Sequence, residues 1–160
     1  PPSSGMGRLF DGVAAILGIK RRCSYEGQGA VLLGAAASAD DGVYNYTLDG
    51  APLRFDWRDM IRGIVTDMNR GDDVGAIAAR FMNTLIDMAT RQCGAARSET
   101  GLDSVVLSGG TFQNMYLMRR LPERLREAGF TVYHHSRVST NDEGISLGQL
   151  MVAQHQLERK

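Results

Sequence analysis

The sequence predicts a single mixed α/β domain, rich in helix, in which a helical layer precedes a β-α-β-α unit. A chain of 160 residues is the length of one domain, and its 43% hydrophobic content is enough for a buried core. Apolar residues recur at helical spacing through most of the part before residue 101. Beyond it, short β-branched runs alternate with helical patterns, which favours parallel strands joined by a right-handed crossover.

The N-terminal part, residues 1–43, is expected to be helical. Apolar residues at three- and four-residue spacing predict a first helix over 8–17, which Gly18 ends. A second helix, over 27–37, is rich in alanine and glycine, so another backbone can approach it closely. The opening residues 1–5 lack an initiator methionine and the pattern of a signal peptide, and we interpret them as a cut inside a longer protein.

The middle part, residues 44–100, predicts a hairpin followed by two long helices. Polar and apolar residues alternate on both sides of a turn at Asp49-Gly50, which is typical of a short hairpin. Amphipathic spacing then predicts helices over 57–68 and 74–88, with Asp56 as the N-cap of the first. Two such helices in succession indicate a helical layer.

The C-terminal part, residues 101–160, carries the β-α-β-α pattern. Pro122 has no N–H to donate, so we expect it to kink the first helix of this part or to begin a second helix after Leu121. The expected elements are, in order, a strand over 105–107, a helix from Met115, a strand over 130–133 and a last helix from Ile145.

Charge and cysteine usage exclude several functional classes. The chain has 18 Lys+Arg and 18 Asp+Glu, so no broad field attracts nucleic acid or anionic lipid. No apolar run reaches the roughly 18 residues of a membrane-spanning helix. Cys23 and Cys93 have no neighbours at metal-ligand spacing, which indicates free thiols in a reducing cytoplasm. The histidines show no i, i+4 pair, so a complete metal site is not expected.

The best local signal for chemistry follows the strand over 105–107, where Gly109-Gly110 leads into a helix. Such a turn exposes backbone N–H groups and the positive end of the helix dipole, which suits a phosphate or an adenosine held close to the backbone. Asn114 can donate hydrogen bonds to a sugar or base and accept them. The alternative is a tight structural turn that needs small residues. Ser108 is not in a Gly-x-Ser-x-Gly elbow, so covalent catalysis is not expected.

Three further residues have both a structural and a functional interpretation. Asp142 is either an oxygen ligand for a cation or the N-cap of the last helix, and spacing alone favours the cap. Asp11 either interacts with a helix dipole or holds the vicinal hydroxyls of a ribose. Gly27 either caps the second helix or lets a nucleotide lie against the backbone.

Taken together, the sequence motifs around these residues resemble the C-terminal part of the hydrogenase-maturation carbamoyltransferase family. The resemblance implies one lobe of an actin-like ATPase (ASKHA) fold, shared with the tRNA threonylcarbamoyl transferases, in which two lobes clamp ATP. Residues 1–160 would then form a single nucleotide-binding lobe, the second of the two. The blocks that carry the resemblance, in this order along the chain, are 6–14, 24–28, 79–85, 107–114 and 141–149.

The resemblance also implies an activity and its partners. The full enzyme converts carbamoyl phosphate and ATP to a carbamoyl adenylate. It then passes the carbamoyl group to the C-terminal cysteine of a partner maturation protein, on the way to the cyanide ligands of a hydrogenase. The N-terminal lobe of the same protein and its other modules are missing here, so the isolated fragment is expected to be inactive.

Where the motifs match, the resemblance also implies which residues of this chain form the binding site. Asp11 would hold the adenosine ribose, and Gly27 would border the nucleotide. Asp142 looks like the distant member of a divalent metal site whose histidine pair lies upstream. The residues implied to cradle adenosine and phosphate are Gly109, Gly110 and Asn114.

Three positions depart from the family pattern. Met82 stands where relatives usually carry a histidine, which puts a polar role there in doubt. Gly5 replaces a usual serine and Glu143 a common glycine, changes that alter loop conformation without abolishing binding.

Two other functions stay open on the sequence. One is the corresponding lobe of a threonylcarbamoyl transferase acting in tRNA modification, although the zero net charge and the Arg8-Leu9-Phe10 block favour the hydrogenase family. The other is a non-catalytic nucleotide- or partner-binding module, in which the glycine turns are structural and the helices over 57–68 and 74–88 bury a partner surface.

Overall fold

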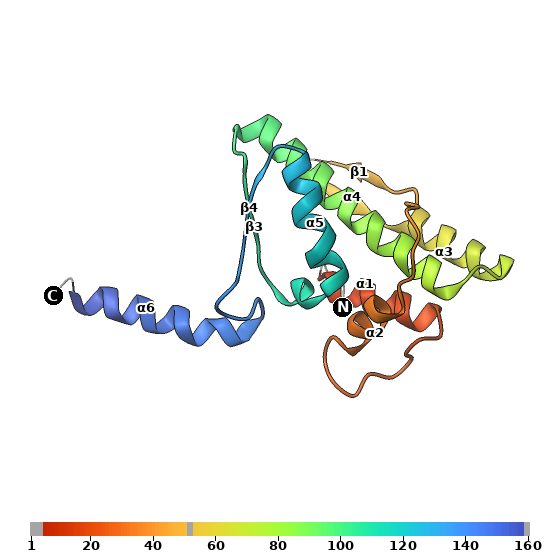
Figure 1. Ribbon diagram of the computed structural model, residues 1–160, viewed down its shortest axis with the longest axis horizontal. Helices are drawn as coiled ribbons and strands as arrows, with labels where there is room; N and C mark the ends of the chain where they lie inside the picture. Colours follow the sequence, from red (N-terminus) through yellow and green to blue (C-terminus); the bar gives the residue numbers. More distant parts are fainter. Residues whose placement is uncertain (1–4, 51–52, 159–160) are drawn as a thin grey trace.

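The computed structural model describes residues 5–50 and 53–158, and it contains the predicted helical layer followed by a β-α-β-α unit (Figure 1). The elements are α1 (Met6–Ile16), α2 (Gln28–Ala36), β1 (Thr47–Asp49), β2 (Arg54–Asp56), α3 (Arg58–Arg70), α4 (Val74–Thr100), β3 (Ser104–Leu107), the 3-10 turn η1 (Gly110–Gln113), α5 (Met115–Glu127), β4 (Thr131–His134), the 3-10 turn η2 (Asp142–Gly144) and α6 (Ile145–Glu158).

Helix α4 forms the centre of the helical layer. It contacts α2, α3 and α5, and residues on several of its faces are fully buried. Phe81 of α4 meets Phe10 of α1 edge to face, with the ring centroids 5.2 Å apart, a favourable arrangement for two aromatic rings. The core that surrounds this pair includes Leu33, Met60, Ile64, Ile77 and Leu125.

The C-terminal unit contains the predicted parallel strand pair. β3 pairs with β4 in parallel, in a register that places Val106 opposite Tyr133 and Leu107 opposite His134. Val105 and Val132 pack against the core, whereas Val106 and Tyr133 are 69% and 56% exposed. One face of this small sheet is therefore uncovered. The predicted hairpin also forms, with β1 antiparallel to β2, and its residues 51–52 lie outside the described ranges.

Two expectations for the helices differ from the structure. No second helix begins after Leu121, because α5 continues from Met115 to Glu127 with Pro122 inside it, buried like Leu121 and Leu125. The packing of these buried side chains outweighs the lost backbone hydrogen bond.

Helix α4 does not end near residue 88 but continues to Thr100. Tertiary contacts hold its last turns: the Arg97 guanidinium lies 4.1 Å from the centroid of the Phe130 ring and donates a hydrogen bond to the Ala128 carbonyl at 3.0 Å.

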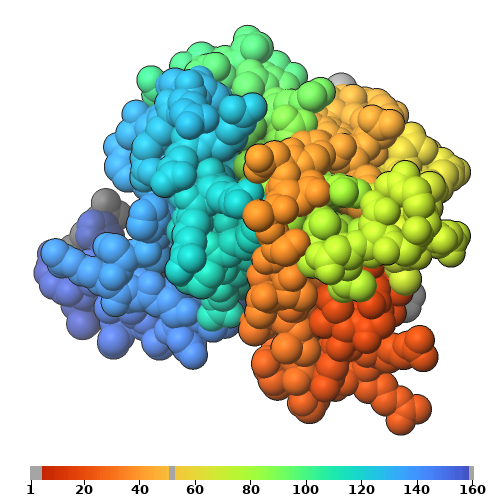
Figure 2. Space-filling view, turned by 45° about the vertical axis from the view of Figure 1, so that its right-hand side comes forward, coloured from red at the N-terminus to blue at the C-terminus, as the bar shows by residue number. Residues whose placement is uncertain are grey.

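The segment between α2 and β1 is tied down by a charged network. In Figure 2 this orange segment runs between α5 and the green and yellow helices. Arg80 of α4 lies 3.0 Å from Asp40, 2.8 Å from Asp67 and 3.1 Å from Asp72. The Tyr44 hydroxyl donates to the buried Asp67 carboxylate at 2.7 Å, and burial together with this hydrogen bond raises the pKa of Tyr44.

Asn114 joins the helical layer to the C-terminal unit. Its Oδ1 accepts hydrogen bonds from the backbone N–H groups of Tyr116 and Leu117, which caps α5. Its Nδ2 donates to the Ala30 carbonyl of α2 at 3.3 Å. Gly34 permits this close approach, because a Cβ there would lie 2.8 Å from Nδ2.

Helix α6 differs from the other helices in its surroundings. It contains no Asp, Glu, Lys or Arg between Ile145 and Leu157, and its residues are exposed along its whole length. Figure 1 shows it projecting from the body of the molecule, and apart from η2 no element makes an extensive contact with it. No helix within residues 5–50 and 53–158 is long and apolar enough to cross a membrane.

Replacing Gly34 with alanine is expected to destabilise the chain by about 1–2 kcal/mol, although alanine is the better helix former by about 1 kcal/mol. The new methyl group would displace the Asn114 amide from Ala30. Gly94→Ala is the matched control, because a Cβ at Gly94 meets nothing within 4 Å, and it should stabilise by about 0.5–1 kcal/mol. Denaturant unfolding of both variants measures the difference, and equal shifts would contradict the expectation.

Arg80→Ala is expected to cost about 3 kcal/mol, because it removes a partner of the buried Asp67 carboxylate. Arg62→Ala is the control. Arg62 forms an exposed ion pair with Asp59, so its loss should change the free energy of unfolding by less than about 0.5 kcal/mol.

The same network predicts a dependence of stability on acid. Hydrogen bonds from Arg70 and Arg80 lower the pKa of Asp72 from 3.8 to about 2, and Arg80 also lowers that of Asp40. A carboxyl with a lowered pKa in the folded state contributes stability above its unfolded pKa and loses it as the pH falls to the folded value. Stability should therefore decline between pH 3.8 and about 2, and less steeply in Arg80→Ala, as unfolding measured across that range will show.

Candidate functional site

The first candidate residue, Asp11, lies where α1 meets the start of α2. Its Oδ1 would be 2.9 Å from a Cβ at Gly29, so glycine at position 29 is what lets the two helices approach. Asp11 pairs with Arg8 at 3.3 Å and keeps 29% of its side chain exposed. A partly exposed carboxylate beside the first turn of a helix can interact with the helix dipole and still accept hydrogen bonds from a ligand.

Gly27 occupies the N-cap position of α2. Its φ of 82° is left-handed, a conformation that favours glycine, and its carbonyl accepts the N–H of Val31 at 3.0 Å. Nothing lies within 4 Å of a Cβ built there. The structure thus gives Gly27 the capping role that the sequence allowed, and the space beside it is open to a ligand.

The Gly109-Gly110 turn follows β3 as predicted, but two details differ. Gly109, with φ of 100°, donates its N–H to the Thr140 carbonyl at 2.8 Å, so this group is not free for a phosphate. The chain then makes the single 3-10 turn η1 before α5 begins at Met115. A Cβ on either glycine would meet nothing within 4 Å, so the surface above both is open.

Asn114 is 8% exposed, and both ends of its amide have partners in the chain. Besides the bonds to Tyr116, Leu117 and Ala30, Nδ2 lies 3.9 Å from the Met82 sulfur. A thioether is only a weak hydrogen-bond acceptor. The structure therefore shows Asn114 first as a cap and a bridge to α2.

Asp142 begins η2, and its carboxylate is exposed. The expectation that Asp142 is the N-cap of the last helix differs from the structure: Asp142 lies inside η2, and α6 begins only at Ile145. Asn141 caps η2, because its Oδ1 accepts the N–H of Glu143 at 3.1 Å. Within the described residues no group of three or more His, Cys, Asp or Glu is placed to hold a metal ion. Asp142 alone does not make a metal site, because one carboxylate supplies too few ligands.

A series of contacts links the candidate site residues, which are far apart in the sequence, along one side of the molecule. Asp11 touches Gly29 in the first turn of α2, the next residue, Ala30, accepts from Asn114, and η1 connects Asn114 back to Gly109. Gly109 is bonded to Thr140, two residues before Asp142. Figure 1 shows α1, α2, η1 and the loop before α6 on this side.

The structure adds a pair of side chains that the sequence analysis missed. The Ser108 hydroxyl and Nε2 of His135 are 3.0 Å apart, and both residues directly follow the ends of paired strands. The parallel register of β3 and β4 was the signal that would have brought them together. The cysteines are both free, and burial raises the pKa of the Cys93 thiol, which disfavours the reactive thiolate.

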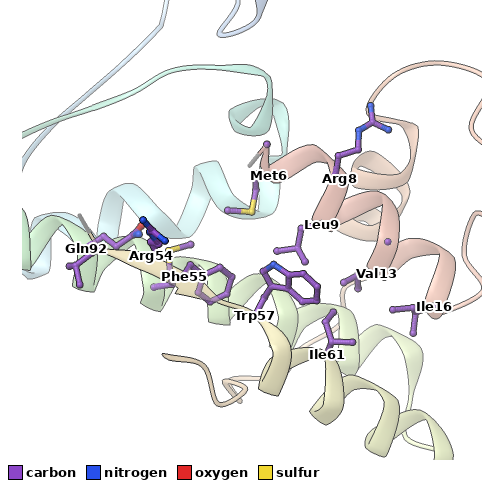
Figure 3. Close-up of a pocket in the computed structure, with 14 residues that line it drawn as sticks. Met6, Arg8, Leu9, Val13, Ile16, Arg54, Phe55, Trp57, Ile61 and Gln92 are labelled. Atoms are coloured by element: carbon purple, nitrogen blue, oxygen red, sulfur yellow. The ribbon is translucent and has the colours of Figure 1, made fainter. Parts of the chain in front are cut away.

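A cleft of about 760 Å³ lies elsewhere, between α1, the β1–β2 hairpin, α3 and α4. In Figure 3 the Trp57 ring points toward Leu9 and Ile61 inside it, and none of the candidate residues lines it. Its walls are mostly apolar, so it is a less suitable place for a polyphosphate than the open glycine turns.

The chain is similar to known proteins over nearly its whole length. Residues 1–149 match the family model described as the carbamoyltransferase Kae1-like domain, second subdomain. The HypF carbamoyltransferase of Synechocystis sp. is 34% identical over 155 residues, which are 94% of this chain and 19% of that protein. That of Rhodobacter capsulatus is 36% identical over 166 residues, 99% of this chain and 20% of the relative.

Among solved structures, full-length HypF in a phosphate- and nucleotide-bound crystal form matches with a TM-score of 0.90 and 41% identity, over 97% of this chain and 21% of that one. The chain thus spans about a fifth of the length of these relatives. Because the family model matches almost the whole chain, the chain belongs to the second subdomain of the Kae1-like domain of the carbamoyltransferases.

Proposed function

We propose that this chain is the C-terminal, nucleotide-binding lobe of an ATP-dependent carbamoyltransferase. The observation that carries the proposal is the continuous series of contacts from Asp11 through Asn114 and Gly109 to Thr140, beside Asp142. It links candidate residues that are far apart in the sequence, and a Cβ at Gly27, Gly109 or Gly110 would meet nothing within 4 Å. A relative of the same subdomain fold that holds phosphate and nucleotide supports it.

In this proposal each site residue has a distinct task. The Asp11 carboxylate accepts hydrogen bonds from the ribose hydroxyls, and Gly27 borders the nucleotide. Gly109 and Gly110 let the adenosine and phosphate lie close to the backbone, and the N–H of Gly109 fixes the turn through Thr140. Asn114 acts indirectly and does not contact the nucleotide. Its amide holds the starts of α2 and α5 at the spacing that the nucleotide requires.

The reaction proposed for the whole enzyme starts from carbamoyl phosphate and ATP and forms a carbamoyl adenylate. The carbamoyl group then passes to the C-terminal cysteine of a partner maturation protein, in the synthesis of hydrogenase cyanide ligands. This lobe contributes binding and orientation of the adenylate. Asp142 would be one ligand of the divalent metal, with the remaining ligands outside this chain. Cys23 and Cys93 are both free thiols, which suits the cytoplasm.

The surface of the C-terminal unit supports a partner lobe. Parallel sheets are normally covered on both faces, yet Val106 and Tyr133 leave one face of β3–β4 exposed. Leu150, Met151 and Leu157 on α6 are 68%, 60% and 72% exposed. The match to full-length HypF covers 97% of this chain, so at least part of α6 lies within the matched region. The first subdomain of the Kae1-like domain is the occupant that we propose for both surfaces.

The tRNA-modifying alternative has less support, because two tRNA threonylcarbamoyltransferases that match the chain share 29% and 26% identity with it, against 34% and 36% for the HypF carbamoyltransferases described above. A purely non-catalytic module would need the helices α3 and α4 to bury a partner. Helix α4 is instead largely buried inside this chain, which leaves little of it for such an interface.

Asp11→Asn in the full-length enzyme should weaken binding of a non-hydrolysable ATP analogue at least tenfold, because charge-assisted hydrogen bonds to the ribose are lost. Asp59→Asn, an exposed carboxylate of α3, is the matched control and should bind normally. Titration calorimetry measures both. Unchanged affinity in Asp11→Asn would remove Asp11 from the site. Loss of stability rather than of affinity is expected to dominate Asn114→Ala.

Amide hydrogen exchange tests the partner lobe. The backbone N–H groups of α6 should exchange at least tenfold more slowly in the full-length enzyme than in the 160-residue chain, because docking on the first subdomain protects them. The buried turns of α4 serve as the control and should differ little. Equal exchange of α6 in both proteins would contradict the proposal. Protection that rises with concentration of the short chain alone would indicate a second copy instead.

A further inference from the structure

Ser108 and His135 form a polar pair that the proposed roles above do not use. They come directly after Leu107 and His134, which are register partners in the parallel pair β3–β4. Their Oγ and Nε2 atoms lie 3.0 Å apart, and both side chains are exposed. Two carboxyl ends of parallel strands thus present a hydroxyl and an imidazole side by side at one edge, the edge where open α/β sheets bind ligands.

The pair lies next to the proposed nucleotide site. Ser108 precedes Gly109 in the chain, and the Gly109 N–H is bonded to Thr140 of the loop that follows His135. This bond removes a backbone donor that the sequence had suggested for the phosphate. The side chains that flank the turn can supply donors in its place, since a serine hydroxyl and an imidazole N–H both bond phosphate oxygens.

The hydrogen bond between the two side chains arranges these donors. When Nε2 of His135 carries the proton, it donates to Ser108 Oγ, and the hydroxyl hydrogen is then free to point to a ligand. When a phosphate arrives, the imidazole N–H and the hydroxyl can both turn to its oxygens. Until then the hydrogen bond keeps the two side chains beside each other, so that binding requires only rotation about their own side-chain bonds, which lowers its entropic cost.

The same pair is poorly suited to nucleophilic catalysis. A serine nucleophile needs its histidine oriented by a third group, commonly a carboxylate. Within residues 5–50 and 53–158 no hydrogen bond or ion pair joins His135 to a carboxylate. Exposure of both side chains also leaves the hydroxyl hydrated rather than activated. A binding role therefore fits the geometry better than a covalent one.

We propose that Ser108 and His135 together bind a phosphate oxygen of the nucleotide, so that they form the phosphate end of the site. This inference rests on the proposed function, because it assumes that the nucleotide lies at Gly109-Gly110. It assigns to two side chains, from two different strands, the recognition of phosphate, while Asp11 recognises the ribose. The phosphate end and the ribose end of the nucleotide are thus bound by residues from different parts of the fold.

The test compares ligands with and without phosphate on the full-length enzyme. His135→Ala and Ser108→Ala should each weaken a non-hydrolysable ATP analogue about tenfold and leave adenosine affinity within about twofold. His135→Gln retains a side-chain donor and should recover part of the loss. Arg119→Ala removes an exposed charge from α5 and controls for a long-range electrostatic effect.

The possible results separate the two proposals. Wild-type enzyme that fails to bind both the ATP analogue and adenosine overturns the proposed function. Wild-type enzyme that binds, with both Ser108→Ala and His135→Ala unchanged, overturns the role of the pair alone. An equal loss for the ATP analogue and for adenosine also overturns it, because the pair would then support the loop rather than contact phosphate. Thermal unfolding of each variant checks that the fold is retained.

Discussion

The buried amide of Asn114 is the interaction on which the arrangement of this lobe depends. It caps α5 through Tyr116 and Leu117 and reaches the Ala30 carbonyl of α2, so it joins the helical layer to the β-α-β-α unit. A buried amide that loses one partner leaves an unsatisfied polar group, which costs more than the bond itself contributes. Gly34 is the complement of this amide, because only glycine leaves room for Nδ2 there. The starts of α2 and α5, where the candidate site lies, are therefore fixed by one side chain.

Asn114 joins two parts of the molecule that differ in how well their apolar surfaces are covered. The helical layer is closed: α4 is buried by its neighbours, and the Arg80 network ties the segment after α2 to α3 and α4. The C-terminal unit is open, with an uncovered sheet face and with helix α6, which has no Asp, Glu, Lys or Arg before Glu158, standing away from the body. Apolar surface of this kind is stable in water only when something covers it. The candidate site lies along the boundary between the two parts, where a second lobe would also close over a nucleotide.

Backbone geometry dominates this site, with few side chains taking part. Gly27 and Gly109 adopt left-handed conformations beside open space, and the Asp11 carboxylate lies close to Gly29 in the first turn of α2. Such a site binds and orients a ligand rather than activating one, because it offers no buried nucleophile and base and no complete metal site within the described residues. The chemistry of a carbamoyl transfer would then depend on groups contributed by the rest of the enzyme, which is consistent with a chain that spans about a fifth of its relatives.

The sequence by itself determined the order of the elements, the parallel strand pair and the positions of the glycine turns, because these depend on local spacing and on residues with unusual backbone freedom. It also identified the candidate residues, since the motifs are contiguous blocks. The tertiary structure alone decided that α5 passes through Pro122, that α4 extends to Thr100, that Asp142 lies inside η2 with Asn141 as its cap, and that Ser108 meets His135. Most of these depend on contacts between segments distant in sequence, such as Arg97 with Phe130, and the choice of cap depends on how the loop before α6 turns. Packing energy between such segments outweighs local preference, and no local pattern records it.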